Sequence, residues 1–396
     1  MTVASPETSD TISSREPIRV MIVDDSAVVR GIIGNWFAGD PGFAVVASHF
    51  NGRRAVDDVT NSKPDVIILD LEMPEMGGLD ALPLILERKP GTAVIVASTL
   101  SQRGAEASIT ALNLGAADYL PKPSAATNKI NSAEFRADLL QKVRELGLKA
   151  RRRIERTAAA RPAPALTAGV AVAAPAPAPV AKLAPQPIAK PRMPEALRRP
   201  STAPVRAIVI GSSTGGPQAL SKVFTALGPA MAGVPVLVTQ HMPPTFTTIL
   251  AEHLSRSAGR DAREGTDGEV VVPGRIYVAP GARHMLITRS GQDVVIRLSD
   301  APPVNYCKPA VDPLFQSAAA VYGANLLGVV LTGMGTDGAK GGQAIVAAGG
   351  TMIAQDEETS VVWGMPGAMA ATGVCSGILP IDDIGPKLVG FLGGRR

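Results

Sequence analysis

The sequence predicts an α/β protein in which a linker joins two doubly wound, mostly parallel sheets. Short apolar runs alternate with helical patterns from residue 18 to about 140, and the alternation returns over 205–396. Between these regions, residues 141–204 form a basic helical run followed by an Ala/Pro-rich tract. Such a tract cannot bury a core. A chain of 396 residues has room for this arrangement.

The first domain follows a polar segment, residues 1–17, that we expect to be a disordered tail. Short apolar runs that indicate buried strands occupy residues 19–23, 43–47, 66–69, 93–97 and 118–120. Helical patterns separate them, so the strands should lie parallel in one sheet. Functional groups in such sheets collect at the carboxyl ends of the strands.

Polar residues stand at those strand ends: Asp24, Asp25, Asp70, Ser98 and Lys122. Three carboxylates at one edge repel each other unless a divalent cation lies among them, and their oxygen ligands suit Mg²⁺. The carboxylate of Asp70 can then attack a phosphoryl group in line. Ser98 can hydrogen-bond a phosphate oxygen, and Lys122 can pair with the added charge. Each residue alone is an ordinary loop residue, but the set indicates a phosphoryl-accepting site.

Residues 18 to about 140 resemble a response-regulator receiver domain. The matching stretches are residues 23–26, 69–74, 97–99 and 120–123. The resemblance implies a flavodoxin-like fold, bound Mg²⁺ and phosphorylation of Asp70 by a histidine-kinase partner.

Charge and composition exclude several classes of protein. Residues 150–204 carry ten Lys/Arg and two Asp/Glu, whereas the whole chain has a net charge of only +4. The rest of the chain is therefore net acidic, which argues against a nucleic-acid-binding face. Cys307 and Cys375 supply neither a disulfide framework nor a metal site. Without a membrane-length apolar run or signal-peptide pattern, we expect a cytoplasmic protein with no membrane insertion.

A glycine-rich turn, residues 211–216, organises the second domain. It follows an apolar run, precedes Pro217 and contains G-x-S-x-G centred on Ser213. Glycines allow the sharp bend that exposes a nucleophile at the end of a strand. The same turn is compatible with a phosphate or dinucleotide loop. A dinucleotide site needs an acidic residue after the second strand, but His241 stands there, which favours a hydrolase.

Further apolar runs predict the remaining strands of this domain. The expected strands are 207–210, 236–239, 275–279, 294–298, 327–331 and 351–354. We interpret 275–279 and 294–298 as a hairpin excursion, with His284 in the loop before the hairpin turn at 291–293.

Ser213, His241 and Asp337 each follow a predicted strand. They supply the nucleophile, the base and the carboxylate that acyl transfer needs. Alone, His241 could be a packed histidine and Asp337 could form an Asx turn. The order Ser…His…Asp differs from that of the α/β-hydrolases, so we exclude that family.

The second domain closely resembles the catalytic domain of the chemotaxis protein-glutamate methylesterases. The matching stretches are residues 211–216, 240–244, 279–281, 302–305 and 331–338. The resemblance implies a catalytic triad of Ser213, His241 and Asp337. It also implies that the Thr214 side chain and the Met334 backbone support the oxyanion, without a cofactor. The implied substrates are γ-glutamyl methyl esters on the helices of methyl-accepting chemoreceptors, and also receptor glutamines.

Two other functions remain to be weighed. A phosphorylation-dependent adaptor with vestigial esterase activity would carry the same motifs. A DNA-binding regulator is disfavoured because residues 205–390 show an α/β pattern and no basic recognition helix. The family also implies that the unphosphorylated receiver covers the active-site face. We expect its Ser98 and Tyr119 side to make that contact.

Overall fold

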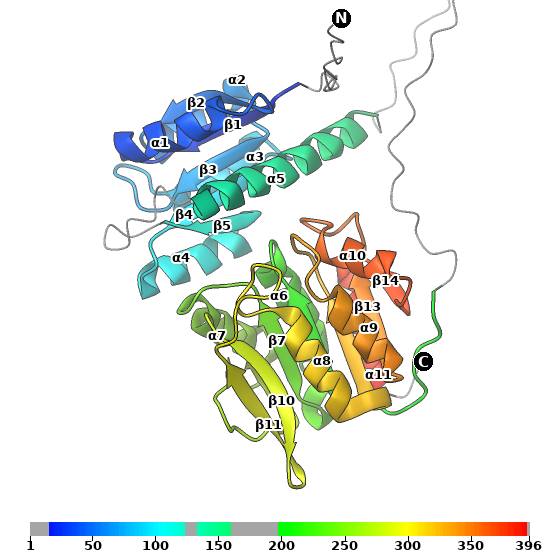
Figure 1. The fold of residues 1–396 in the computed structure, drawn as a ribbon. Coiled ribbons are helices and arrows are strands. Elements are labelled where there is room, and N and C mark those ends of the chain that lie inside the picture. The colour runs from blue at the N-terminus through cyan, green and yellow to red at the C-terminus, as the bar shows by residue number, and fades with distance from the viewer. Residues whose placement is uncertain (1–15, 123–132, 160–196, 394–396) are drawn as a thin grey trace, which may run out of the picture.

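The computed structural model describes residues 16–122, 133–159 and 197–393, which form two stacked α/β domains (Figure 1). The predicted fold class is confirmed. Most of the expected tail and of the Ala/Pro tract lies outside the described residues. No helix in the described ranges has both the length and the apolar character required to cross a bilayer.

The N-terminal domain is a five-stranded parallel sheet in the order β2-β1-β3-β4-β5. Its elements are β1 (Ile18–Val23), α1 (Ala27–Ala38), β2 (Phe43–His49), α2 (Gly52–Ser62), β3 (Val66–Asp70), α3 (Gly78–Arg88), β4 (Ala93–Ser98), α4 (Gln102–Asn113), β5 (Asp118–Pro121) and α5 (Ala133–Ala159). Side chains alternate between the faces of each strand. Val20 and Ile22 therefore join the core under α1 and α5, while Met21 and Val23 join the core under α2, α3 and α4.

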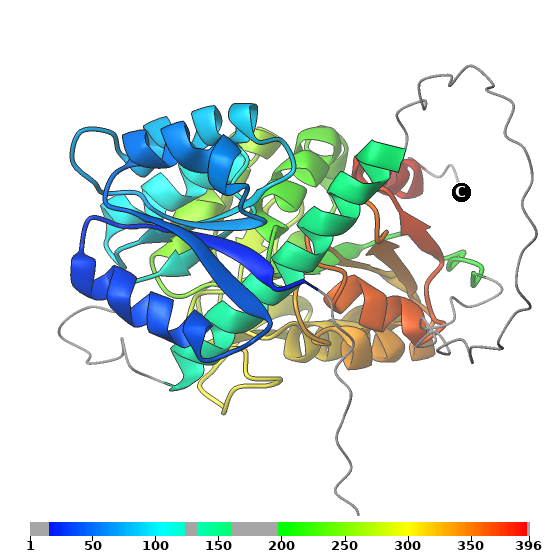
Figure 2. The same ribbon diagram turned by 90° about the horizontal axis from the view of Figure 1, so that it is seen from above.

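Helix α5 extends past residue 140, where the sequence predicted the end of the first domain. It continues as one helix to Ala159, and its Leu139, Val143 and Leu146 are buried in the core of the N-terminal domain. The basic run that the sequence assigned to the linker is thus partly an amphipathic helix with one apolar face. Figure 2 shows α5 running along the boundary between the two domains.

The C-terminal domain has a seven-stranded parallel sheet in the order β14-β13-β12-β6-β7-β9-β8. Its elements are β6 (Ala207–Ser212), α6 (Gly216–Leu227), β7 (Val236–Gln240), α7 (Phe246–Ala258), β8 (Ala262–Glu264), β9 (Ile276–Val278), β10 (His284–Ser290), β11 (Asp293–Ser299), α8 (Val311–Tyr322), β12 (Leu326–Val330), α9 (Ala339–Ala347), β13 (Thr351–Gln355), α10 (Met365–Ala371), β14 (Gly377–Leu379) and α11 (Ile381–Leu392). Helices α6, α7 and α11 cover one face of this sheet, and α8, α9 and α10 cover the other.

The hairpin prediction was partly wrong. Strand β9, within the expected strand 275–279, is parallel to β7 in the main sheet, and the hairpin consists of β10 and β11. His284 opens β10 instead of lying in a loop. The outer half of β10 is exposed and polar, so its apolar run is too short to predict a strand.

Residues 197–204, assigned to the linker, also contact the C-terminal domain. The Arg198 amide donates to the Cys375 carbonyl at 2.9 Å, and Ser201 Oγ donates to the Ala324 carbonyl at 2.9 Å. These bonds fix the segment to the turns that precede β14 and β12, so the folded unit begins before residue 205.

Candidate functional site

The turn after β6 places Ser213 at the carboxyl edge of the sheet. Gly215 has φ +74°, and a Cβ atom there would lie 2.4 Å from a Val361 methyl, so glycine is required. The Ser213 amide donates to the Thr332 carbonyl at 3.0 Å, while its own carbonyl accepts from Gln240 Nε2 at 2.9 Å. The backbone of Ser213 is therefore held by two neighbouring strands, and its side chain stays half-buried.

His241 and Asp337 meet at the same edge. His241 Nε2 lies 2.8 Å from Asp337 Oδ2, although 96 residues separate them. The amides of Val311 and Asp312 donate to Asp337 at 2.6 and 3.1 Å, which places its carboxylate at the N-terminus of α8. Burial alone raises the pKa of Asp337, but the bonds from His241 and these amides hold it below its ordinary value. Asp337 is therefore an anion that fixes the Nε2–H tautomer of His241.

The other imidazole nitrogen faces a cysteine. Cys307 Sγ lies 3.3 Å from His241 Nδ1, and no hydrogen bond joins Ser213 to His241 within the described ranges. Because Nε2 is bonded to Asp337, Nδ1 is the ring nitrogen of His241 that remains to accept a proton. In the described arrangement this nitrogen is in contact with Cys307.

The N-terminal domain lies against this edge through β5 and α4. Thr214 Oγ1 donates to Asp118 Oδ2 at 2.9 Å, and this contact is buried. The Tyr119 and Phe246 rings stack with centroids 4.8 Å apart. Gln218 Nε2 donates to the Leu112 carbonyl at 3.0 Å. The expected contact through the Tyr119 side is therefore present.

A lysine from α5 contacts the two β5 residues, Asp118 and Tyr119, that face the esterase domain. Lys142 Nζ pairs with Asp118 Oδ2 at 3.0 Å and donates to the Tyr119 carbonyl at 3.2 Å. Burial alone lowers the pKa of Lys142, but Asp118 and Asp138 outweigh burial and raise it above its ordinary value. Lys142 is therefore charged, and it neutralises the Asp118 carboxylate at the interface.

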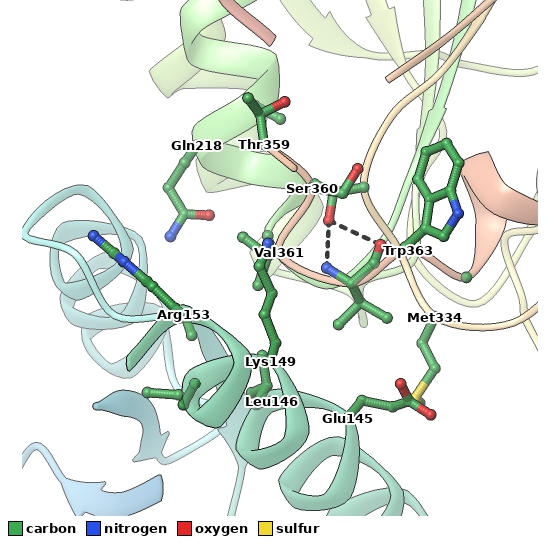
Figure 3. A pocket seen from close by; sticks show the side chains of 18 of the residues that line it. Glu145, Leu146, Lys149, Arg153, Gln218, Met334, Thr359, Ser360, Val361 and Trp363 are labelled. Carbon is green, nitrogen blue, oxygen red and sulfur yellow. Dashed lines mark hydrogen bonds between the residues drawn. The ribbon is translucent and has the colours of Figure 1, made fainter. Parts of the chain in front are cut away.

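Beside this contact a cavity of about 1060 Å³ separates α5 from the C-terminal domain. Figure 3 shows Glu145, Lys149 and Arg153 of α5 on one side and Met334 and Trp363 on the other. The two domains therefore touch around Thr214 and Tyr119 but leave a gap farther along α5.

The carboxylates and the lysine predicted to form a phosphoryl-accepting site lie together at the other end of β5. Lys122 Nζ lies 2.7 Å from both Asp24 Oδ2 and Asp70 Oδ2. Burial raises the pKa of Asp70 to about 6, although the bond from Lys122 opposes this change. Ser98 Oγ does not reach this cluster by a hydrogen bond; it lies 2.5 Å from Ser108 Oγ of α4.

The carboxylates of the same cluster fit a hard cation. One oxygen from each of Asp24, Asp25 and Asp70 can be chosen so that all lie within 4.8 Å of one another. An all-oxygen set with one exposed member leaves room for the waters and phosphate oxygen that Mg²⁺ retains. The residues present therefore fit Mg²⁺.

Comparison with known proteins assigns a family to each of the two domains. Residues 208–388 match the CheB methylesterase family model, and residues 20–133 match the response regulator receiver domain. A protein-glutamate methylesterase/protein-glutamine glutaminase from Rhodopseudomonas palustris HaA2 is 54% identical over 96% of both chains. The chain belongs to the CheB methylesterase family. The resemblance seen in the motifs is confirmed.

Two further proteins show the extent of the similarity. A relative from Bradyrhizobium diazoefficiens, named protein-glutamate methylesterase/protein-glutamine glutaminase of group 2 operon, is 52% identical over 100% of both chains. The crystal structure of the Thermotoga maritima CheB methylesterase catalytic domain is 40% identical, with a TM-score of 0.46. It covers 47% of this chain and 98% of that chain.

Several residues of this CheB-family chain escaped the sequence reasoning. Gln240 lies in a stretch quoted for the resemblance without a role of its own; it accepts from the buried Ser212 hydroxyl and donates to the Ser213 carbonyl. Asn305 lay in a stretch quoted for the resemblance, but no role was assigned to it; its Nδ2 lies 3.2 Å from Asp337 Oδ1. The sequence predicts Asp118 only as the first residue of a strand, whereas in the structure its carboxylate contacts Thr214 of the other domain. Their partners are distant in sequence, so no local pattern could reveal them.

Proposed function

We propose that this protein is a phosphorylation-activated serine esterase that removes methyl groups from glutamate γ-methyl esters on methyl-accepting chemoreceptors. It also deamidates receptor glutamines, acts in the cytoplasm and receives phosphate from a chemotaxis histidine kinase. The observation that carries the proposal is the His241–Asp337 pair beside the Ser213 turn, directly beneath the receiver domain.

The geometry supports a two-step acyl transfer. Ser213 Oγ attacks the ester carbonyl carbon while His241 Nδ1 takes the hydroxyl proton, and Asp337 stabilises the imidazolium. The carbon–methoxy bond then breaks, and methoxide leaves with that proton as methanol. Water adds to the acyl-serine by the same route and releases the glutamate carboxylate. Thr214 Oγ and the Met334 backbone support the oxyanion.

In the receiver domain, Asp24, Asp25 and Asp70 would hold Mg²⁺, which supplies positive charge for phosphoryl oxygens. The Asp70 carboxylate accepts the phosphoryl group. Lys122 now pairs with two carboxylates and would pair with the phosphate instead. The Ser98 hydroxyl, which now bonds the Ser108 hydroxyl of α4, would bond a phosphate oxygen instead.

These exchanges lie close to the domain contact. Lys122 follows Tyr119 by three residues in the same segment, and Ser108 is on α4, which also carries Leu112. Movement at either point acts directly on Asp118, Tyr119 and Gln218. In the described state Asp118 engages the Thr214 hydroxyl, so that donor is withheld from an oxyanion. We therefore propose that the unphosphorylated receiver inhibits the esterase through this interface.

The test is methanol release from methylated receptor membranes. We compare the full chain with residues 197–396 alone, each with and without acetyl phosphate and Mg²⁺. We expect the isolated domain to be faster than the unphosphorylated full chain, and the full chain to be stimulated. A form with a shortened Ala/Pro tract should be regulated nearly as wild type, because a flexible tether only sets an effective concentration. If the isolated domain is no faster, inhibition by the receiver is wrong. If no form releases methanol, the adaptor is the better account.

The esterase should depend on pH through His241. Burial alone lowers the pKa of His241, but its bonds to Asp337 and Cys307 outweigh burial and raise it to about 9. Only the neutral imidazole can accept a proton, so we expect kcat/KM to increase as the pH rises through about 9. Cys307→Ala removes one contact that raises the pKa, and the increase should move to lower pH. Profiles of p-nitrophenyl acetate hydrolysis provide the measurement, with Cys375→Ala as the control. Superimposable profiles for wild type and Cys307→Ala would contradict this role.

A further inference from the structure

The loop between β11 and α8 carries an unusually exposed aromatic residue. Tyr306 has a relative exposure of 102%, the highest among the exposed large hydrophobic side chains of the described residues. α8 begins at the end of the esterase domain that faces the receiver (Figure 1). Tyr119 of the receiver is buried against Phe246 of the esterase domain, whereas the domain contact leaves Tyr306 uncovered.

The backbone at Tyr306 has a positive φ, a conformation that tyrosine rarely adopts. Val304 and Cys307 exchange two backbone hydrogen bonds of 3.1 and 2.9 Å, which close a two-residue turn. Its central residues, Asn305 and Tyr306, have φ +51° and +64°. Such a turn favours asparagine followed by glycine. A tyrosine at the second position is strained, and strain of this kind is retained most often at functional sites.

Both neighbours of Tyr306 contact the catalytic groups. Asn305 Nδ2 lies 3.2 Å from Asp337 Oδ1 and 3.3 Å from Asp312 Oδ2. Cys307 Sγ lies 3.3 Å from His241 Nδ1. The turn is thus anchored on each side to the triad, and the Tyr306 ring stands out from the rim of the active site.

We infer that Tyr306 is a specificity-determining residue that packs against the receptor helix beside the glutamate that is being demethylated. The inference rests on the proposed function. A modified glutamate on a helix must enter the site from the helix surface, so the substrate brings the side chains of adjacent turns to the rim. A rigid tyrosine offers a large contact area at low entropic cost. A small ester reaches Ser213 without touching the rim.

The test compares two substrates. Steady-state kinetics are measured with methylated receptor membranes and with p-nitrophenyl acetate, on wild type, Tyr306→Ala and Tyr306→Phe. We expect Tyr306→Ala to raise KM for receptor at least fivefold with kcat within twofold. The ratio of receptor kcat/KM to small-ester kcat/KM should fall by the same factor. Tyr306→Phe should retain at least half of the wild-type ratio, since the ring makes the contact.

Two further variants separate recognition from folding. Tyr306→Gly relieves the positive φ, so its melting temperature should equal or exceed that of wild type while receptor KM rises as in Tyr306→Ala. Val270→Ala removes another exposed apolar side chain of the esterase domain, at 42% exposure, and should match wild type on both substrates. Equal losses on both substrates would assign the turn to triad geometry alone and overturn the inference. An unchanged receptor KM in Tyr306→Ala would also overturn it. If wild type hydrolyses the small ester but not the receptor ester, the proposed function fails instead.

Discussion

Replacing Ser213 with alanine should reduce methanol release from methylated receptors by on the order of 10⁴-fold or more, because no other group forms the acyl intermediate. The main-chain N–H and C=O of Ser213 bond the Thr332 carbonyl and the Gln240 side chain, and the Ser213 hydroxyl takes no part in these bonds, so the fold should be unchanged. The measurement is the initial rate of methanol release with acetyl phosphate and Mg²⁺, alongside the melting temperature.

A matched control for this loss is Ser221→Ala. Ser221 lies on α6, and its hydroxyl donates to the Pro217 carbonyl within the same helix at 3.0 Å. The control should keep wild-type activity. Phosphorylation of Asp70 should proceed normally in both variants, since the receiver site contains neither serine. A Ser213→Ala enzyme with near-normal methanol release would point to another nucleophile, and Cys307 beside His241 would be examined first.

Replacing Asp70 with asparagine should abolish phosphorylation and with it the entire stimulation of the esterase. An amide oxygen is too weak a nucleophile to accept the phosphoryl group, and the cation site loses one of its three carboxylates. Esterase activity in acetyl phosphate should therefore stay at the unstimulated rate. Incorporation of labelled phosphate and methanol release are measured on the same preparation.

The control for Asp70→Asn is Asp57→Asn. Asp57 is an exposed aspartate of α2 that pairs with Arg88 at 3.2 Å, a surface ion pair that contributes little to stability. This variant should be phosphorylated and stimulated as wild type. Label on the Asp70→Asn protein at the wild-type level would show that another residue accepts phosphate.

Much of the architecture could be predicted from the chain because the patterns involved are local. Alternation of side chains along β1 and β3 supplies both faces of the receiver sheet, and the glycines around Ser213 specify a bend wherever they occur. Parallel strands align their carboxyl ends, so polar residues after successive strands converge. That rule places the aspartates with Lys122, and His241 with Asp337. Ser98 also follows its strand, but its hydroxyl bonds Ser108, and no local rule predicts that partner.

The sequence by itself thus determined the two sheets, the nucleophile turn and the residues at the strand ends, because each follows from the preferences of a few consecutive residues. Only the tertiary structure decided how these parts are used. The Thr214–Asp118 contact spans 96 residues and two domains, and the Cys307–His241 contact spans 66. Such contacts depend on how folded surfaces meet, which no short segment encodes. The same holds for the second half of α5, which the sequence predicted as a basic helical run outside the domain, whereas its Val143 and Leu146 are buried in the receiver core.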